Sequence, residues 1–397
     1  MGGGLLQLVA YGAQDVYLTG NPQITFFKAV YRRHTNFAIE AIQQTFNGTP
    51  GFGQRVTTTV ARNGDLIHRV YLALDLNGME ESSKVCKYFG LRLINYVEIE
   101  IGGQKIDKQY SHWMYIWNEL SLPKSKRAGY DDMVGAAGGA VSGLNKQLFV
   151  PLEFWFCRNV GLALPLIALQ YHEVKLNMTY ASKNEMVVNN DHAAHLELHD
   201  VGLWVDYIFL DTDERRRFAQ LSHEYLIEQL QFNGADSIDA SSTGAMKSVR
   251  MTFNHPCKEL IWFVHPEKTD DDTIPHWNNF SKSTNNTYSD ATNPVAMAKI
   301  QLNGNDRFAE REGTYFSSVQ PYQHHECTPD KYHPGINVYS FALKPEEHQP
   351  SGTLNMSRID TAILSMSSTI AGNVSVFSVN YNVLRILSGM GGLAYSN

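Results

Sequence analysis

The chain has few charged residues, few cysteines and no long apolar run. Charged residues make up 18% of its 397 residues, and the formal net charge is -7. The basic runs, residues 124–127 and 215–217, are short, and the second adjoins acidic residues. A chain with a negative net charge and only short basic runs lacks the basic surface that nucleic acid binding requires. We therefore expect no direct nucleic acid binding.

Cysteine is also scarce. The four cysteines lie far apart, at positions 86, 157, 257 and 327, and form no CxxC pair. Neither a small-domain disulfide framework nor a zinc site has this spacing, so we expect free thiols in a reducing compartment. The N-terminal stretch has no positive n-region, and its apolar part is too short for a secretory signal or a membrane span. We expect a soluble polypeptide made in the cytosol.

Aromatic residues, in contrast, are plentiful. Tyrosine and phenylalanine number 20 and 19, and these residue types favour strands and packed interfaces. A chain of 397 residues exceeds what one hydrophobic core usually serves. The length therefore predicts two domains of about 200 residues each.

Two parts of the chain follow the same plan. Residues 93–109 (LINYVEIEIGGQKIDKQ) contain an alternating strand, a Gly102-Gly103 turn and a polar restart. Residues 297–311 (MAKIQLNGNDRFAER) repeat this plan with Asn303-Gly304 at the turn. Two more pairs keep a similar offset, namely residues 62–67 with 254–261 and residues 173–178 with 352–357. Three matches in one order predict two copies of one β domain.

Short runs of β-branched and aromatic residues, bounded by Gly, Asn, Pro or Asp, predict about eight strands in each half. Strands of this kind, with loops of unequal length and short helices in them, favour an all-β fold of two eight-stranded jelly-roll sandwiches. The expected divisions are an N-terminal arm at 1–24, a first jelly roll at 25–212 and a second at 213–397. The polar string DTDERRRFAQ at 211–220 is expected to link the two.

Three segments depart from the strand pattern. Residues 110–120 carry apolar side chains at helical spacing before Pro123, which predicts a helix at one end of a sandwich. Residues 124–144 are small and Gly-rich and indicate a flexible loop, with no GxxxxGK[ST] motif that would cradle phosphate. Residues 266–294 are long and polar, and we expect them on the surface.

Candidate metal ligands occur in two histidine-rich stretches. His195 and His199 have the i, i+4 spacing of a metal-binding helix, but the flanking alternation predicts a strand and there is no HExxH motif. Residues 324–327 (HHEC) contain ligand types, but neighbours on an extended chain point to opposite faces. We therefore expect neither a metal nor another cofactor. The sequence also lacks a GxSxG elbow and an SxxK motif, so we expect no enzyme.

Two Asn-X-Ser/Thr sequons fall within the long polar stretch. Asn279 and Asn285 are therefore the candidate glycosylation sites. Sequons inside predicted strands leave little room for a bulky glycan.

Several long strings resemble a known family. GGLLQLVAYGAQDVYLTGNPQITFFKAVYRRHTNFAIE (residues 3–40) resembles the start of major capsid proteins of nucleocytoplasmic large DNA viruses, above all those of chlorella and other algal viruses. FNGTPGFGQRVTTTVARNGDLI (46–67), PSGTLNMSRID (350–360) and YNVLRILSGMGGLAYSN (381–397) resemble the same proteins. The resemblance spans both ends and both halves of the chain.

The resemblance implies a double jelly roll, three copies of which form a capsomer with a pseudo-sixfold outline that tiles an icosahedral shell. Three chains with two similar domains each present six similar sides to their neighbours. It also implies a virion protein, synthesised and assembled in the host cytoplasm. Its partners would be copies of itself, neighbouring capsomers and, on the inner side, minor capsid proteins and an internal membrane.

Two sets of residues are candidates for these contacts. Apolar residues of the arm suit docking on the inner side, or else cover the base of the first sandwich: Leu5, Leu8, Val9, Val16 and Tyr17. Aromatic residues near the inter-strand loops suit trimer contacts, or else belong to the core of their own domain: Trp113, Trp117, Tyr130 and Trp155.

Two other classes of protein stay open. A jelly-roll carbohydrate-binding protein would also be β-rich and acidic, but it would not need the apolar arm. A cupin-like metalloenzyme would need two His and one Glu converging inside one barrel. Metal analysis of the purified protein would reveal such a site.

Overall fold

The computed structural model describes residues 3–76, 84–137, 139–140, 147–187, 197–239, 242–266, 277–282, 291–329 and 334–395. The chain divides into two units, Met1–Asn36 and Phe37–Asn397. The first unit contains two short helices, α1 (Gly3–Val9) and α2 (Val16–Thr19), neither of which buries a residue. This unit is longer than the expected arm, and the expected divisions at 24/25 and 212/213 stay predictions.

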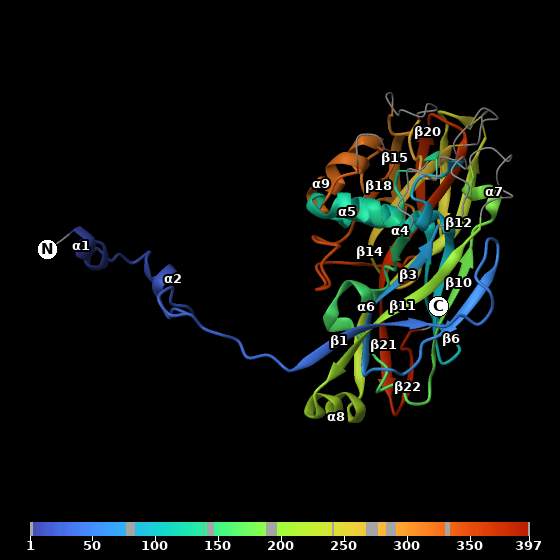
Figure 1. Cartoon of the computed structure of the whole chain (residues 1–397). Coiled ribbons are helices and arrows are strands. Elements are labelled where there is room, and N and C mark those ends of the chain that lie inside the picture. Colours follow the sequence, from blue (N-terminus) through green and yellow to red (C-terminus); the bar gives the residue numbers. More distant parts are fainter. Residues whose placement is uncertain are drawn as a thin grey trace. The chain divides into compact units, whose positions relative to one another are not determined.

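The second unit, here called the body, contains two β-sandwiches, each built from two antiparallel sheets (Figure 1). Sheet 1a has the order β1 (Phe37–Gln44), β11 (His199–Leu210), β3 (Leu66–Asp75), β8 (Gln147–Pro151). Sheet 1b has the order β2 (Arg55–Thr59), β10 (Val174–Tyr180), β5 (Ile94–Ile101), β6 (Gln104–Tyr110). Sheet 2a has the order β12 (His223–Ile238), β21 (Gly372–Leu387), β14 (Pro256–Pro266), β18 (Asn337–Ser340). Sheet 2b has the order β13 (Met246–Met251), β20 (Ala362–Ser368), β15 (Val295–Leu302), β16 (Asn305–Asp306).

Six short strands remain, of which two form a separate small sheet and four extend the sheets above. These are β4 (Lys84–Val85), which pairs with β7 (Gly139–Ala140), and β9 (Leu164–Pro165), β17 (Arg311–Glu312), β19 (Leu354–Asn355) and β22 (Met390–Leu393). The last four pair with β3, β15, β14 and β21 respectively. The all-β class and the two successive sandwiches are as predicted.

The two sandwiches have the same strand order, which explains the repeats in the sequence. The hairpin β5–β6 corresponds to β15–β16, and their turns at Gly102-Gly103 and Asn303-Gly304 have positive φ at all four residues. Such turns match the right-handed twist of the flanking strands. One predicted match is wrong: residues 352–357 lie around β19, whereas the strand that corresponds to β10 is β20.

Sheet 2a is buried on both faces. Along β14, Leu260, Trp262 and Val264 belong to the core of the second sandwich, while Ile261 and Phe263 between them belong to the core of the first. Antiparallel sheets commonly leave one face to solvent, and burial of both faces requires a further layer. Sheet 2a is therefore a middle layer that the two sandwiches share.

Helices occupy the connections. They are α3 (Phe89–Leu93), α4 (Ser111–Ser121), α5 (Lys124–Val134), α6 (Trp155–Arg158), α7 (Lys183–Met186), α8 (Thr212–Gln220) and α9 (Gln320–His324). Two 3₁₀ turns lie at Val160–Leu162 and Met356–Arg358, and a π-helical turn lies at Tyr315–Val319. Among the described residues, no helix is long and apolar enough to cross a membrane.

One of the predicted connections has the expected structure and two do not. The helix predicted at residues 110–120 is confirmed as α4. The loop predicted from residue 124 is wrong at its start, because α5 occupies Lys124–Val134 and ends at the left-handed Gly135 that follows it. The linker predicted at 211–220 is also helical, since the Asp211 side chain accepts a hydrogen bond from the Thr212 N–H and acidic residues fill the first turn of α8.

Part of the long polar stretch lies inside the body. Trp277 is 5% exposed and Phe280 is fully buried, and both rings lie about 6 Å from the ring of Tyr115 in α4. The expectation that residues 266–294 lie on the surface is therefore wrong for 277–281, which are buried, whereas Lys282 is exposed. Residues 267–276 and 283–290 of this stretch fall outside the described residues.

Candidate assembly surfaces

Helix α4 is wedged between the two sandwiches and covers the outer face of sheet 2a. The Trp113 ring lies 5.8 Å from Phe377 of β21, and the His112 ring lies 5.7 Å from Phe263 of β14. Aromatic pairs of this kind contribute about 0.5–1.5 kcal/mol beyond their burial. The helix thus joins the two sandwiches, instead of closing one end of the first as predicted.

Hydrogen bonds join the edge of sheet 1b to the edge of sheet 2a. The Leu230 N–H of β12 donates to the Asp107 carboxylate of β6 at 3.0 Å, and the Gln229 side chain donates to the Ile106 carbonyl. Edge strands leave backbone groups unpaired, and here β6 covers the edge of β12. Burial raises the pKa of Asp107 to about 6, although its hydrogen bond from Leu230 acts in the opposite direction.

A chain of paired charges also crosses this boundary. Arg158 of α6 donates to Glu228 at 3.1 Å, and the Lys258 ammonium donates to the other Glu228 oxygen at 2.7 Å and to the Pro345 carbonyl at 2.6 Å. The Arg158 guanidinium also lies 4.0 Å from the centre of the Trp117 ring. Lys258 is fully buried, and a buried charge persists only where partners replace water.

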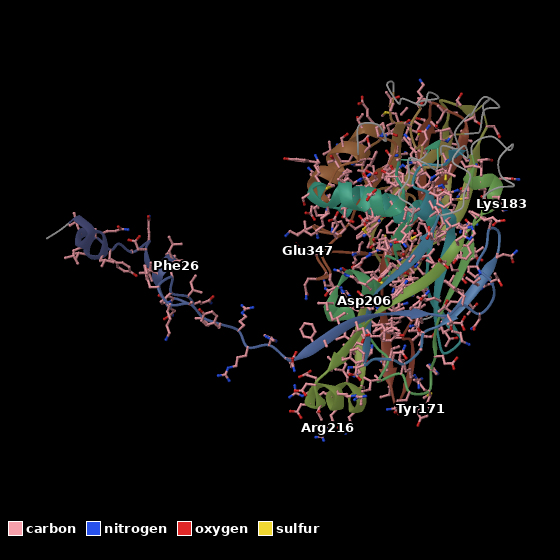
Figure 2. The ribbon with its side chains drawn as sticks, viewed as in Figure 1. Phe26, Tyr171, Lys183, Asp206, Arg216 and Glu347 are labelled. Carbon is pink, nitrogen blue, oxygen red and sulfur yellow. The ribbon has the colours of Figure 1, made fainter. Side chains whose placement is uncertain are left out.

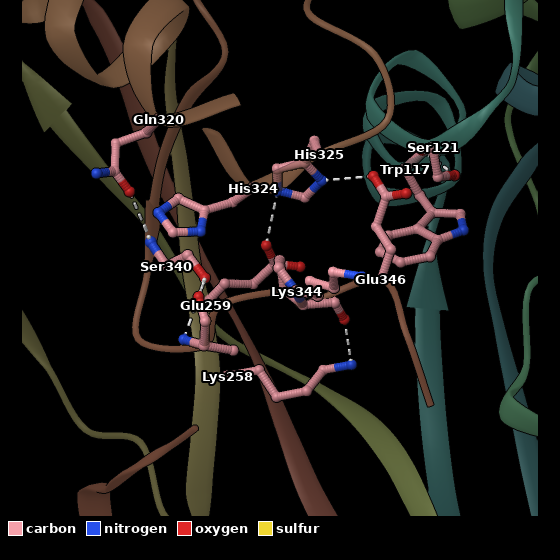
Figure 3. A network of polar contacts seen from close by, with 12 residues as sticks. Trp117, Ser121, Lys258, Glu259, Gln320, His324, His325, Ser340, Lys344 and Glu346 are labelled. Carbon is pink, nitrogen blue, oxygen red and sulfur yellow. Dashed lines mark hydrogen bonds and ion pairs between the residues drawn. The ribbon is translucent and has the colours of Figure 1, made fainter. Parts of the chain in front are cut away.

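A buried histidine bridges two carboxylates beside Lys258 (Figure 3). His325, which follows α9, places Nε2 2.9 Å from Glu259 and Nδ1 2.7 Å from Glu346. Burial lowers the pKa of His325, but the charge of Glu259 and hydrogen bonds to both carboxylates outweigh burial and raise it to about 9. Burial raises the pKa of Glu259, but the charge of His325 outweighs it, and the net shift is downward. His325 is therefore a cation at neutral pH.

The neighbours of His325 have other partners. His324 Nδ1 lies 3.0 Å from the Leu343 carbonyl, and the Cys327 thiol donates to the Leu122 carbonyl at 3.0 Å. Adjacent residues thus point to different parts of the body, as expected for this stretch.

The other histidine-rich stretch is described only in part. His195 lies outside the described residues, while His199 begins β11 with Nε2 3.9 Å from Glu197. Within the part of the chain that the structure describes, no group of three His, Cys, Asp or Glu side chains is placed to hold a metal ion.

The aromatic residues predicted for the trimer contact are buried inside the chain. Trp113, Trp117, Tyr130 and Trp155 are 1%, 6%, 8% and 2% exposed, and all four belong to the core of the first sandwich. A side chain buried to this degree has almost no surface left for a second copy. The prediction that they contact a neighbouring chain is therefore wrong, and the alternative, a place in the core, is correct.

The arm residues predicted to dock on the inner side are all exposed. Leu5, Leu8, Val9, Val16 and Tyr17 have between 50% and 92% of their surface accessible. Further along the same unit, Phe26 and Phe27 are 85% and 97% exposed. Exposed apolar side chains in such number are typical of a segment that binds a partner. What it contacts stays a prediction.

Of the two candidate glycosylation sites, the structure describes only Asn279. Asn279 is 6% exposed, and its side-chain oxygen accepts hydrogen bonds from the backbone and the hydroxyl of Ser281. A buried side chain has no room for a glycan, so the prediction for Asn279 is wrong. Asn285 lies outside the described residues.

The outer face of sheet 1a is an aromatic-rich surface that none of the predictions above includes. Tyr71 of β3 lies opposite Trp204 of β11 with the rings stacked 6.4 Å apart, and Phe149 of β8 lies 6.2 Å from Tyr71. Phe37 and Ile39 of β1, on the same face by register, are 56% and 49% exposed. The sequence of β3 (LIHRVYLALD) contains a signal for this surface, because apolar residues lie on both faces of the strand. A strand of this kind is typically buried on both faces.

Comparison with known proteins gives a consistent result. The model described as "Major capsid protein N-terminus" matches residues 25–211, and the model described as "Large eukaryotic DNA virus major capsid protein" matches residues 214–392. The major capsid protein of Pyramimonas orientalis virus is 53% identical over 100% of both chains. That of Paramecium bursaria Chlorella virus 1 is 46% identical, also over 100% of both.

Solved structures agree. The crystal structure of PBCV-1 VP54 matches with a TM-score of 0.81 at 42% identity, over 94% of this chain and 100% of that one. The Faustovirus major capsid protein matches with a TM-score of 0.74 at 12% identity, over 95% and 94% of the two chains, which supports the fold alone. The two sandwiches are thus the double jelly roll of capsid proteins. The chain belongs to the major capsid proteins of large eukaryotic DNA viruses, and its role is structural, in the capsid of a virion.

Proposed function

We propose that three copies of this chain form one capsomer with a pseudo-sixfold outline, and that such capsomers tile the outer shell of an icosahedral capsid. The observation that carries this proposal is the identical strand order of the two sandwiches. Each chain contributes two similar sides, so that three chains contribute six. A closed ring of this kind is suited to a lattice in which every capsomer has six neighbours.

The rigid junction between the sandwiches supports the proposal. A ring closes only if the two sandwiches of each chain keep one relative orientation. The aromatic wedge of α4 and the buried pair Lys258–Glu228 hold that orientation, because moving the sandwiches apart would expose apolar rings and separate buried charges.

The N-terminal unit is proposed to dock on the inner side of the shell, against minor capsid proteins and an internal membrane. Its exposed apolar residues, such as Leu8 and Tyr17, are the support for this assignment. Deletion of residues 1–24 should leave the capsomer intact and abolish its incorporation into shells, as followed by sedimentation of assembled particles. Loss of the capsomer itself would argue for a role of the arm within the ring.

We further propose synthesis and assembly in the host cytoplasm and no catalytic activity. Capsid formation needs only association, which burial of complementary surface supplies. The buried charged residues described above each have a structural partner, such as Glu346 for His325.

The test of the proposed function is the mass of the native protein in solution, measured by light scattering after size exclusion. Three chains of 44.7 kDa, stable to dilution, are the expected result. A monomer at the concentrations found during assembly would contradict the trimeric capsomer, while leaving the family assignment in place.

A further inference from the structure

The contact between the two sandwiches of one chain joins two different surfaces, and each of these surfaces has an equivalent on the other sandwich. Within the chain, β6 and α4 of the first sandwich cover β12 and the outer face of sheet 2a. Because the two sandwiches have the same strand order, β12 corresponds to β1, and sheet 2a to sheet 1a. On the covering side, β6 corresponds to β16, and α4 to the helical segment 315–324 that follows it. Each sandwich therefore has one side equivalent to the covering side of the first sandwich and one side equivalent to the covered side of the second.

The correspondence extends to single residues on the covered side. Both β3 and β14 carry a bulge, and counting from it, the facing pair Tyr71–Trp204 corresponds to the facing pair Ile261–Phe377. Ile261 and Phe377 are 0% and 2% exposed because the first sandwich covers them. Tyr71 and Trp204 are only partly buried. The same position is thus sealed in the second sandwich and open in the first.

We propose that the outer face of sheet 1a is covered by the second sandwich of a neighbouring copy, whose β16 and segment 315–324 take the places of β6 and α4. This inference rests on the trimeric capsomer proposed above and adds which surfaces meet. The edge of β1, where Phe37 and Ile39 are exposed, is then covered as the edge of β12 is. The covering segment presents two exposed apolar side chains of its own, Val319 and Tyr322. Because the two surfaces are unlike, the contact is heterologous, and in the proposed capsomer three such contacts close the ring.

The ends of the hairpins support the same arrangement. Within the chain, the turn end of β5–β6 is covered by β22, which follows the last strand of the second sandwich. The Leu393 N–H donates to the Gln104 side chain at 3.1 Å, and His172 Nδ1 lies 2.8 Å from the Gly391 carbonyl. The segment after the last strand of one sandwich therefore seals the hairpin of the other.

The corresponding hairpin, β15–β16, ends beside an open hollow of about 470 Å³. By register, the residue that corresponds to His172 is Asp360, which is exposed and lines this hollow. The segment after the last strand of the first sandwich is α8, which carries the exposed Arg216 and lies at the same end of the body as β22 (Figure 1). Figure 2 shows Arg216 and Tyr171 at the same end of the body, the lower end in this view. Arg216 of one copy is thus expected to face Asp360 of the next, with opposite charges.

Cross-linking tests this pairing. The double variant Arg216→Cys/Asp360→Cys, treated with a short bis-maleimide, should give covalent dimers and trimers on a denaturing gel. Each single variant is the control for the four native cysteines and should give neither. A mass of three chains in solution without any cross-linked product in the double variant would overturn this inference and leave the capsomer proposal intact. A monomeric wild type would overturn both.

A second measurement tests the apolar face. Ile39→Asp should raise the protein concentration at which the trimer dissociates by about tenfold or more, because it places a charge in the buried contact. The matched control is Met246→Asp on β13, which changes a residue of similar exposure, 43%, on neither of the two surfaces. Light scattering at several dilutions reports the dissociation, and circular dichroism confirms that both variants fold. Equal behaviour of the two variants would contradict the assignment of sheet 1a.

Discussion

Replacing Lys258 with methionine should cost much stability, although the two side chains have similar size. Lys258 is fully buried, and its ammonium donates to Glu228 at 2.7 Å and to the Pro345 carbonyl at 2.6 Å. The variant leaves Glu228 with Arg158 as its remaining charged partner. Removing one member of a buried pair costs about 3–5 kcal/mol. Because Arg158 stays in place, we expect the lower end of this range, about 3 kcal/mol.

The measurement is the urea midpoint of unfolding at pH 7, followed by tryptophan fluorescence at one fixed protein concentration, since association would shift the midpoint. The double variant Lys258→Met/Glu228→Gln should be more stable than the sum of its single changes predicts, by about 1–3 kcal/mol. Lys344→Met is the matched control: its ammonium pairs with Glu347 at 2.8 Å, but both side chains are more than half exposed. Such a surface pair is worth about 0–1 kcal/mol. Equal losses for Lys258→Met and Lys344→Met would refute the reasoning from burial.

Three further variants test other parts of the structure. The folded-state pKa of His325 is raised from 6.5 to about 9, so the stabilisation from its charge is complete below pH 6.5 and is lost as pH rises through 9. The urea midpoint of the wild type should therefore fall between these pH values, and that of His325→Gln should fall less. Parallel curves for the two proteins would contradict the ion pairs. Gly102→Ala should lower the melting temperature more than Gly304→Ala. Both turns need positive φ, but only at Gly102 would the new Cβ lie 2.3 Å from the His172 side chain. Equal shifts in melting temperature would argue against close packing over the first hairpin. Trp113→Ala should lower stability by about 3–5 kcal/mol in urea unfolding; a loss of trimers with unchanged stability would show that it contacts a neighbouring chain after all.

Local features of the fold were predictable from the sequence. The Gly102-Gly103 and Asn303-Gly304 turns are short-range signals, because the flanking strands need positive φ between them. The spacing of apolar residues before Pro123 likewise predicted α4. Residues 211–220 were predicted to be a linker because they are highly charged, although Asp211 is a residue type that commonly caps a helix such as α8. Each success or failure of this kind depends on residues within a few positions of one another.

The candidate contacts were harder to predict, because an apolar residue has the same signature whether its partner lies in its own chain or in another. Trp113 and Tyr71 are both aromatic residues beside the boundary of a sandwich, yet one is buried in the core and the other lies on an open face. Trp277 and Phe280 sit in a polar stretch, but they fill the space next to Tyr115, far away in sequence. No local pattern carries that information.

The sequence by itself determined the β class, the duplication and the family, since these depend on periodicity, turn residues and strings that can be matched along the chain. Only the tertiary structure decided which surfaces are shared. The docking of α4 on sheet 2a buries one face of β14 and leaves the corresponding face of β3 open, although the two strands have equivalent places in their sandwiches. The tertiary structure also places His325 between Glu259 and Glu346, where the two carboxylates keep the imidazole charged. The physical reason is that burial and Coulomb interactions depend on distance in space, and the residues concerned lie far apart along the chain.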